Sequence, residues 1–219
     1  MPILARVYIV RHGETQENRD GIIQGQLDTA LNAVGLEQAR MVGEKLRSVP
    51  FEMAFTSDLS RAVQTAETIL AHHPNIKLQK KVELRERFMG ALQGKTCTTK
   101  TQAATVDKTA ESGALFAARA ETWWLKDVVS GTASLPSTTS PYHILVISHG
   151  GFIGTLMRSL IHSKRVSCAP GVVVQRCLNT SVTIVDVNHT GLGVIMQWAD
   201  SSHLKSFSNK FVEENADEI

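Results

Sequence analysis

Two histidines in this sequence are each followed by glycine, and each is separated from a preceding short apolar segment by one residue. His12 follows the apolar residues 7–10, and His149 follows 144–147. A neutral imidazole nitrogen acts as a nucleophile or a proton acceptor near pH 7, and glycine lets main chain approach a bound group closely. This pattern favours nucleophilic or acid–base chemistry on a ligand that is held against the backbone.

Two arginines could join these histidines in binding an anion. Arg11 directly precedes His12, and Arg61 falls in the first turn of a predicted helix, where backbone amides and the helix dipole favour an anion. A guanidinium offers a rigid fork of donors that matches phosphate oxygens, and the backbone N–H of Gly150 after His149 would add another donor. Because these cationic groups would repel one another without an anion between them, they predict a phosphoryl pocket.

The elements around these residues would bring them to one edge of a sheet. The segments 7–10, 53–55 and 144–147 predict strands, and 78–84 is a further extended segment. Helices are predicted after about residue 32 and over 59–72, 111–129 and 152–162, and a terminal hairpin over 180–187 and 192–198. This alternation indicates an α/β fold, a three-layer sandwich with a mostly parallel central sheet and helices on both faces. Ligands bind beyond the carboxyl ends of such strands, so His12 and His149 are expected to share one crevice.

The sequence also predicts helix caps and loops. Asn32 is the expected N-cap of the first long helix, and Ser57-Asp58 are the expected caps of the helix over 59–72. No clear period covers 86–108, which we expect to form a loop over the site, within a loop or lid region of about 86–130. The tail, about 209–219, is expected to fray.

Composition limits the class of protein. The chain has 219 residues, 42% of them hydrophobic, and a net charge of +2, so we expect a single domain over 1–219 that binds no nucleic acid. Three cysteines without CxxC spacing argue against a disulfide framework and against a structural zinc site. No apolar stretch is long enough for a membrane span, so the expected protein is cytoplasmic, with no membrane partner. The oligomeric state is not legible.

Five blocks, in order, resemble the motifs of the histidine phosphatase superfamily, in its phosphoglycerate mutase-like branch. They are residues 8–15 (YIVRHGET) with Asn18, 22–28 (IIQGQLD), 57–67 (SDLSRAVQTAE), 84–94 (LRERFMGALQG) and 147–152 (ISHGGF). A lone RHG is a weak signal, but five ordered blocks across 7–187 are specific. The resemblance implies the phosphoglycerate mutase-like fold and phosphoryl transfer.

The resemblance also implies roles for individual residues, without a metal or other cofactor. His12 would become a phosphohistidine, with its second ring nitrogen held by a hydrogen-bond acceptor, Glu86 would be the proton donor, and a protonated His149 would stabilise charge. The predicted substrate-binding residues are Arg11, Asn18, Gln24, Gly25, Arg61, Arg87 and Gly150. Two of these assignments have structural alternatives. Glu86 lies in a mixed charge run that could be a solvated face, and Asn18 could be an ordinary loop residue.

The family contains hydrolases and mutases. Mutases carry a longer insertion with paired arginines after the LQG block, whereas here only 95–110 separate Gly94 from Glu111, with no arginine pair. This difference favours a phosphatase acting on small phosphorylated metabolites, and the block 22–28 looks most like fructose-2,6-bisphosphatase-type and broad-specificity members. The alternatives are a cofactor-dependent phosphoglycerate mutase and a catalytically silent phospho-ligand-binding or scaffold protein. Glu111 and Arg119 resemble a GES…R block in which Ala110 replaces the usual glycine.

Overall fold

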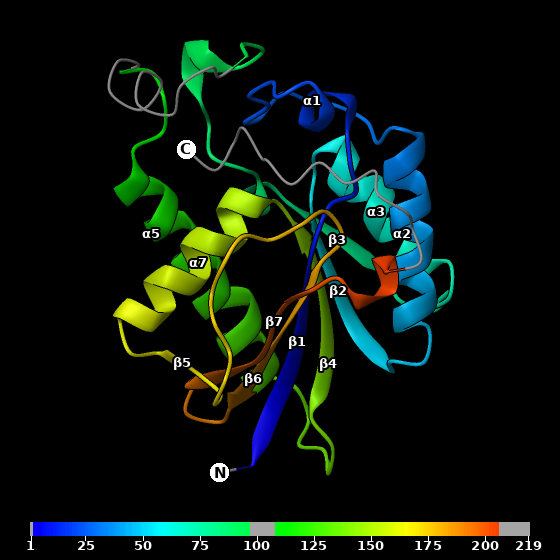
Figure 1. Cartoon of the computed structure of the whole chain (residues 1–219). Helices are drawn as coiled ribbons and strands as arrows, with labels where there is room; N and C mark the ends of the chain where they lie inside the picture. Colours follow the sequence, from blue (N-terminus) through cyan, green and yellow to red (C-terminus); the bar gives the residue numbers. More distant parts are fainter. Residues whose placement is uncertain (1, 97–107, 206–219) are drawn as a thin grey trace.

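The computed structural model describes residues 2–96 and 108–205 (Figure 1). Within these residues, seven strands form one sheet in the order β3-β2-β4-β1-β6-β7-β5. The strands are β1 (Ile3–Arg11), β2 (Phe51–Ser57), β3 (Leu78–Lys81), β4 (Tyr142–Ser148), β5 (Val166–Cys168), β6 (Val182–Asn188) and β7 (Gly193–Asp200). Only β6 runs antiparallel to its neighbours, so the predicted mostly parallel sheet is confirmed.

Helices cover both faces of the sheet, as predicted. The α-helices are α1 (Gln16–Arg19), α2 (Ala33–Leu46), α3 (Ser60–Leu70), α5 (Gly113–Trp123), α6 (Gly131–Ala133) and α7 (Gly150–His162). Shorter 3-10 turns are η1 (Val82–Leu84), η2 (Gly90–Leu92) and η4 (Ser202–Leu204), and η3 (Trp124–Ser130) is a π-helix. Figure 1 shows α2 and α3 on one side of the sheet, and α5 and α7 on the other.

Strand β1 illustrates why the sheet is buried between two helical layers. Val7 and Ile9 pack into the core beneath α5 and α7, whereas Tyr8 and Val10 pack into the core beneath α2 and α3. Successive side chains of a strand point to opposite faces, so an unbroken apolar run requires cover on both sides. The same alternation holds in β4, its parallel neighbour.

The register of β1 and β4 brings the two predicted histidines together. Arg11 is paired with Ser148, and the backbone N–H of His12 donates to the carbonyl of Ser148 at 2.9 Å. The two strands therefore end level with each other. His12 and His149 follow at the same edge of the sheet, where α/β folds bind their ligands.

The predicted cap of α2 is confirmed. Asn32 occupies the N-cap position, and its side-chain oxygen accepts a hydrogen bond from Gly35 N at 2.8 Å. This contact satisfies one of the backbone amides that the first turn leaves unpaired.

The predicted caps of α3, Ser57 and Asp58, are wrong. The N-cap residue is Leu59, which has no side-chain capping bond. Asp28 instead reaches across from a distant loop and accepts from the backbone N–H and the hydroxyl of the first helical residue, at 2.6 and 3.0 Å. Asp58 is engaged by Arg85 through two hydrogen bonds of 2.7 and 2.6 Å. Asp28, which is distant in the sequence, therefore caps α3 in place of a neighbouring residue.

Other boundaries differ from the expectations. The extended segment 78–84 is a strand only to Lys81, because a 3-10 turn follows, and the helical backbone after α5 continues beyond 129 to Ala133. Strand β5 was not expected, since three residues show no period. The predicted frayed tail, residues 97–107 of the loop over the site and, with them, Cys97 lie outside the described residues.

Candidate active site

His12 is oriented by its own neighbour in the chain. The ring Nδ1 lies 2.7 Å from the carbonyl oxygen of Gly13. A carbonyl only accepts hydrogen bonds, so Nδ1 carries the proton and Nε2 of the neutral ring keeps its lone pair. The carbonyl of Gly13 is therefore the hydrogen-bond acceptor that fixes the tautomer needed for nucleophilic attack by Nε2.

The backbone that carries His12 is held from three sides. The amide of Gly13 donates to the hydroxyl of Thr65 at 3.0 Å, and the side-chain amide of Asn179 donates to the carbonyl of His12 at 2.9 Å. A Cβ added to Gly13 would lie 2.5 Å from the carbonyl oxygen of Gly35 in α2. Only glycine permits this backbone-to-backbone approach, which explains the glycine after the histidine.

His149 lies beside His12 at the start of α7. The ring centroids are 5.1 Å apart with an angle of 59° between the planes, and both rings are buried. Neither ring nitrogen of His149 has a hydrogen-bond partner among the described residues. Buried polar atoms are nearly always satisfied, so two such nitrogens in one pocket indicate a place for a polar ligand.

Two buried arginines complete the pocket. Arg11 donates from Nη1 to the carbonyl of Cys177 at 2.7 Å, while its Nε is buried without a partner in the described part of the chain. Arg61 donates to the carbonyls of Leu27 and Gly25 at 2.7 and 2.8 Å. These backbone carbonyls orient both guanidinium groups and, being neutral acceptors, do not cancel their charge.

Burial and the charges of these arginines lower the pKa of both histidines well below the usual value. Burial is the largest cause for each ring, followed by repulsion from Arg61. Arg11 contributes to both shifts, and His12 adds to that of His149. The protein groups therefore keep both imidazoles neutral near pH 7, which suits a nucleophile. The prediction of a protonated His149 is not met by the protein groups alone, because only an added anion would favour the imidazolium.

Glu86 reaches the same pocket from the segment after η1. Its side chain is 1% exposed, which rules out the alternative of a solvated charge run. Oε2 accepts from Gly151 N at 2.8 Å and Oε1 accepts from Arg87 N at 2.9 Å. A Cβ on Gly151 would lie 2.5 Å from Oε1, so the second glycine after His149 makes room for this carboxylate.

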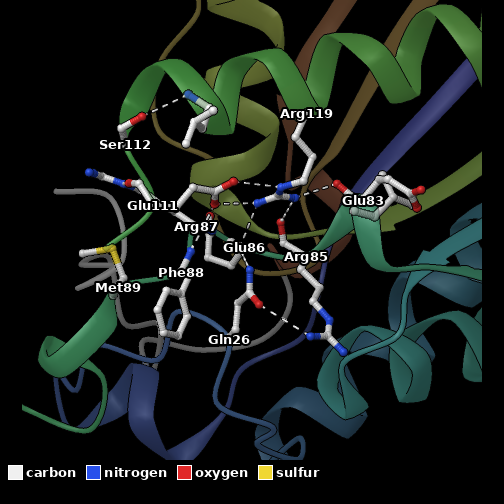
Figure 2. A network of polar contacts seen from close by, with 12 residues as sticks. Gln26, Glu83, Arg85, Glu86, Arg87, Phe88, Met89, Glu111, Ser112 and Arg119 are labelled. Atoms are coloured by element: carbon white, nitrogen blue, oxygen red, sulfur yellow. Dashed lines mark hydrogen bonds and ion pairs between the residues drawn. The ribbon is translucent and has the colours of Figure 1, made fainter. Parts of the chain in front are cut away.

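Figure 2 shows the contacts that hold the backbone around Glu86. The guanidinium of Arg119 donates to the carbonyls of Glu83, Arg85 and Glu86, at 2.7, 2.9 and 3.3 Å. The carboxylate of Glu111 binds Arg119 at 2.8 and 3.0 Å. One arginine of α5 thus binds three backbone carbonyls within residues 83–86, the segment that carries Glu86.

The loop between β1 and α2 contributes three predicted residues. Asn18 is buried, its Oδ1 accepts from Thr15 N at 3.2 Å, and its Nδ2 has no partner in the described chain. The side-chain oxygen of Gln24 accepts from the hydroxyls of Thr15 and Thr29, at 3.0 and 2.6 Å. Gly25 offers its carbonyl to Arg61. Asn18 thus presents donors, whereas Gln24 braces the loop.

A family model described as histidine phosphatase superfamily (branch 1) matches residues 7–201 of this sequence. The chain belongs to this superfamily. The match spans all the residues of the pocket described above, from Arg11 to His149.

Named relatives of this histidine phosphatase extend over most of its length. A broad-specificity phosphatase of Saccharomyces cerevisiae is 32% identical over 209 residues, covering 92% of this chain and 88% of the yeast protein. The fructose-2,6-bisphosphatase TIGAR B of Danio rerio is 30% identical over 214 residues, covering 80% and 83%. The solved structure of a mycobacterial glucosyl-3-phosphoglycerate phosphatase superposes with a TM-score of 0.75 at 23% identity, covering 90% of this chain and 99% of the other, and so supports the fold. The family and these relatives support phosphatase activity.

The structure of this histidine phosphatase brings together Arg11, His12, Arg61, Glu86 and His149. Arg87 and Gly150 line an adjoining cavity. Sequence reasoning missed several supporting residues, namely Thr65, Asn179 and the role of the Glu111–Arg119 pair. The resemblance to a GES…R block was the only signal for that pair.

Two further properties concern metals and membranes. Among residues 2–96 and 108–205, no three His, Cys, Asp or Glu side chains gather in a way that could hold a metal ion. In the same residues, no helix has the length and apolar character needed to cross a bilayer.

The buried histidines predict a specific pH dependence of stability. Their pKa values are lower in the folded protein than in the unfolded chain, so unfolding takes up protons and stability falls as pH drops below about 6.5. Each ring contributes a slope of up to about 1.4 kcal/mol per pH unit. We expect His149→Asn to reduce the slope of the free energy of unfolding between pH 6.5 and 5, measured by urea titration. The exposed His162, at the opposite end of α7, provides the control His162→Asn, and equal slopes in all three proteins would contradict the buried neutral state.

Proposed function

We propose that this protein hydrolyses phosphomonoesters of small metabolites through a phosphohistidine on His12, without a metal ion. The observation that carries this proposal is the hydrogen bond from His12 Nδ1 to the carbonyl of Gly13, which leaves Nε2 unprotonated between two buried arginines. A nucleophile needs this lone pair, and a phosphoryl group needs the surrounding charge. The two named relatives that act as phosphatases support the same chemistry.

In the first step, Nε2 of His12 attacks phosphorus and the bond from phosphorus to the ester oxygen breaks. Glu86 donates a proton to the departing oxygen, which leaves as an alcohol. Arg11 and Arg61 hold the equatorial oxygens and stabilise the charge that spreads over them. Asn18 Nδ2 supplies a further donor.

In the second step, water attacks the phosphohistidine and the bond from nitrogen to phosphorus breaks. Glu86, now a carboxylate, accepts a proton from this water, and orthophosphate leaves. The net reaction consumes one water and yields one alcohol and one phosphate, and His12 and Glu86 return to their starting states.

His149 acts as a partner of the phosphate in this proposal. A phosphate dianion beside it would offset the repulsion from Arg61 and Arg11 that lowers its pKa. Proton uptake by His149 on binding would then add a third charged donor. The site thus gains its full positive charge together with the substrate.

A trapped intermediate tests the nucleophile. Mixing the enzyme with a phosphate ester labelled with phosphorus-32 and quenching in base should leave label on His12 that is lost in acid. His12→Ala should lose this label and at least about a thousandfold in kcat, and His162→Ala should behave like the parent. Activity should persist in a chelator, followed as inorganic phosphate release. Full activity of His12→Ala, or loss of activity in the chelator, would contradict the proposal.

The identity of the leaving group tests Glu86. Glu86→Gln should lower kcat by about 10²–10⁴ for an alkyl phosphate, whose leaving group needs a proton. The loss should be much smaller for 2,4-dinitrophenyl phosphate, whose leaving group needs none. Gly151→Ala should shift in the same direction, because its Cβ would displace the carboxylate, and Gly131→Ala, whose Cβ has room at 3.4 Å, serves as the control. Equal losses on both esters would contradict an acid role.

The contacts of Arg119 predict that it positions Glu86 without touching substrate. Arg119→Gln should lower kcat for an alkyl phosphate by about tenfold or more, with KM little changed, since the three carbonyls lose their common donor. The alkaline limb of the pH–kcat profile, where a proton donor loses its proton, should move as well, because the surroundings of Glu86 change. A large rise in KM with unchanged kcat would place Arg119 in substrate binding instead.

A further inference from the structure

The short segment before β6 binds the main chain of two pocket residues. Thr180 N donates to the carbonyl of Arg11 at 3.0 Å, and Arg11 N donates to the carbonyl of Ser181 at 3.3 Å. The side-chain amide of Asn179 donates to the carbonyl of His12 at 2.9 Å. These bonds extend the pairing of β1 with β6 past the last residues of the strand register. A shift of this segment would therefore move both pocket residues.

Thr180 has a backbone conformation that its residue type disfavours. Its φ is +56°, in the left-handed region, and its side chain is buried. A β-branched side chain is crowded by its own backbone in this region, so the conformation persists only where the surrounding structure imposes it. A contact that holds the side chain of Thr180 therefore also stabilises the backbone that binds Arg11.

His203 in η4 supplies such a contact. Its Nε2 lies 3.1 Å from the hydroxyl oxygen of Thr180. Its Nδ1 is buried without a hydrogen-bond partner in residues 2–96 and 108–205, so the contact with Thr180 is the hydrogen bond that orients the ring. Burial is the main cause that lowers the pKa of His203 to about 4, while Lys45 adds to this shift and Asp200 opposes it. The ring is therefore neutral near pH 7 and keeps this contact there.

The turn that carries His203 is fixed to α2. Figure 1 shows η4, the red segment, beside this helix. Lys45 of α2 forms an ion pair with Asp200, and its Nζ donates to the hydroxyl of Ser202 at 2.9 Å. Asp200 also accepts from Ser202 N at 3.0 Å. The turn thus has its own supports, and from them His203 reaches Thr180.

We propose that His203 is a positioning residue for phosphoryl transfer, which acts through Thr180 to hold Arg11 and His12 in their reacting geometry. This inference rests on the proposed function of His12. Small displacements of a reacting group slow a reaction strongly, even when their origin lies far from the chemistry. Because the contact fixes the nucleophile and not the proton donor, its loss should slow attack on phosphorus whatever the leaving group.

Two amides that imitate different ring nitrogens test the contact. The amide of glutamine reaches about as far as Nε2 of histidine, whereas the amide of asparagine reaches only to Nδ1. In single turnovers, His203→Asn should slow the labelling of His12 by about tenfold or more, with an alkyl phosphate and with 2,4-dinitrophenyl phosphate alike. His203→Gln should stay within about threefold of the parent. His189→Asn, at an exposed site between β6 and β7, is the control and should label at the parent rate.

A double-mutant cycle separates this role from a general loss of stability. Thr180→Val keeps the shape of the side chain and removes its hydroxyl, whereas Thr180→Ser keeps the hydroxyl. The double variant Thr180→Val, His203→Asn should be no slower than either single variant, because both changes remove the same contact. Thr180→Ser should label much faster than Thr180→Val, and this pair alone tests the contact if His203→Asn does not fold.

Three results would overturn the positioning role of His203. They are a parent-like labelling rate in His203→Asn or Thr180→Val, a rate in His203→Gln as low as in His203→Asn, and losses that multiply in the double variant. In each case the labelled His12 of the parent leaves the phosphatase mechanism standing. Absence of label on His12 in the parent enzyme would instead overturn the proposed function.

Discussion

Cationic groups gathered in a buried pocket are the constraint on which this structure depends. Arg11 and Arg61 are almost fully buried beside two imidazoles, where each charge raises the cost of the next. The fold meets this cost with backbone carbonyls, those of Cys177, Leu27 and Gly25, which bind the guanidinium groups without neutralising them. The pocket therefore retains its positive potential for an anion.

The same use of carbonyls extends to the segment that carries the carboxylate. Arg119 binds the main-chain oxygens of Glu83, Arg85 and Glu86, and the carboxylate of Glu111 forms an ion pair with Arg119 (Figure 2). The negative charge of Glu111 thus lies beside Arg119, which in turn supports the backbone of residues 83–86. In the pocket itself, Glu86 is the carboxylate that backbone amides of Gly151 and Arg87 orient.

The central site could be predicted from the sequence because its residues belong to local patterns. His12 and His149 each follow an apolar strand, and the parallel register of β1 and β4 follows from the α/β pattern. Contacts between distant segments could not be predicted in this way. Asp28 caps α3 from another loop, and Arg119 meets Glu86 across 33 positions of the chain. The charge state of His149 also depends on burial, which has no local signature.

The close contact between Gly13 and Gly35 links the reacting imidazole to the beginning of α2. The carbonyl that orients His12 belongs to a peptide wedged against that helix, so fraying of the first turn of α2 would release the ring while the central strands stay paired. Mild heat or denaturant would then inactivate the protein before its sheet comes apart. Loss of activity and global unfolding would thus occur at different temperatures or denaturant concentrations.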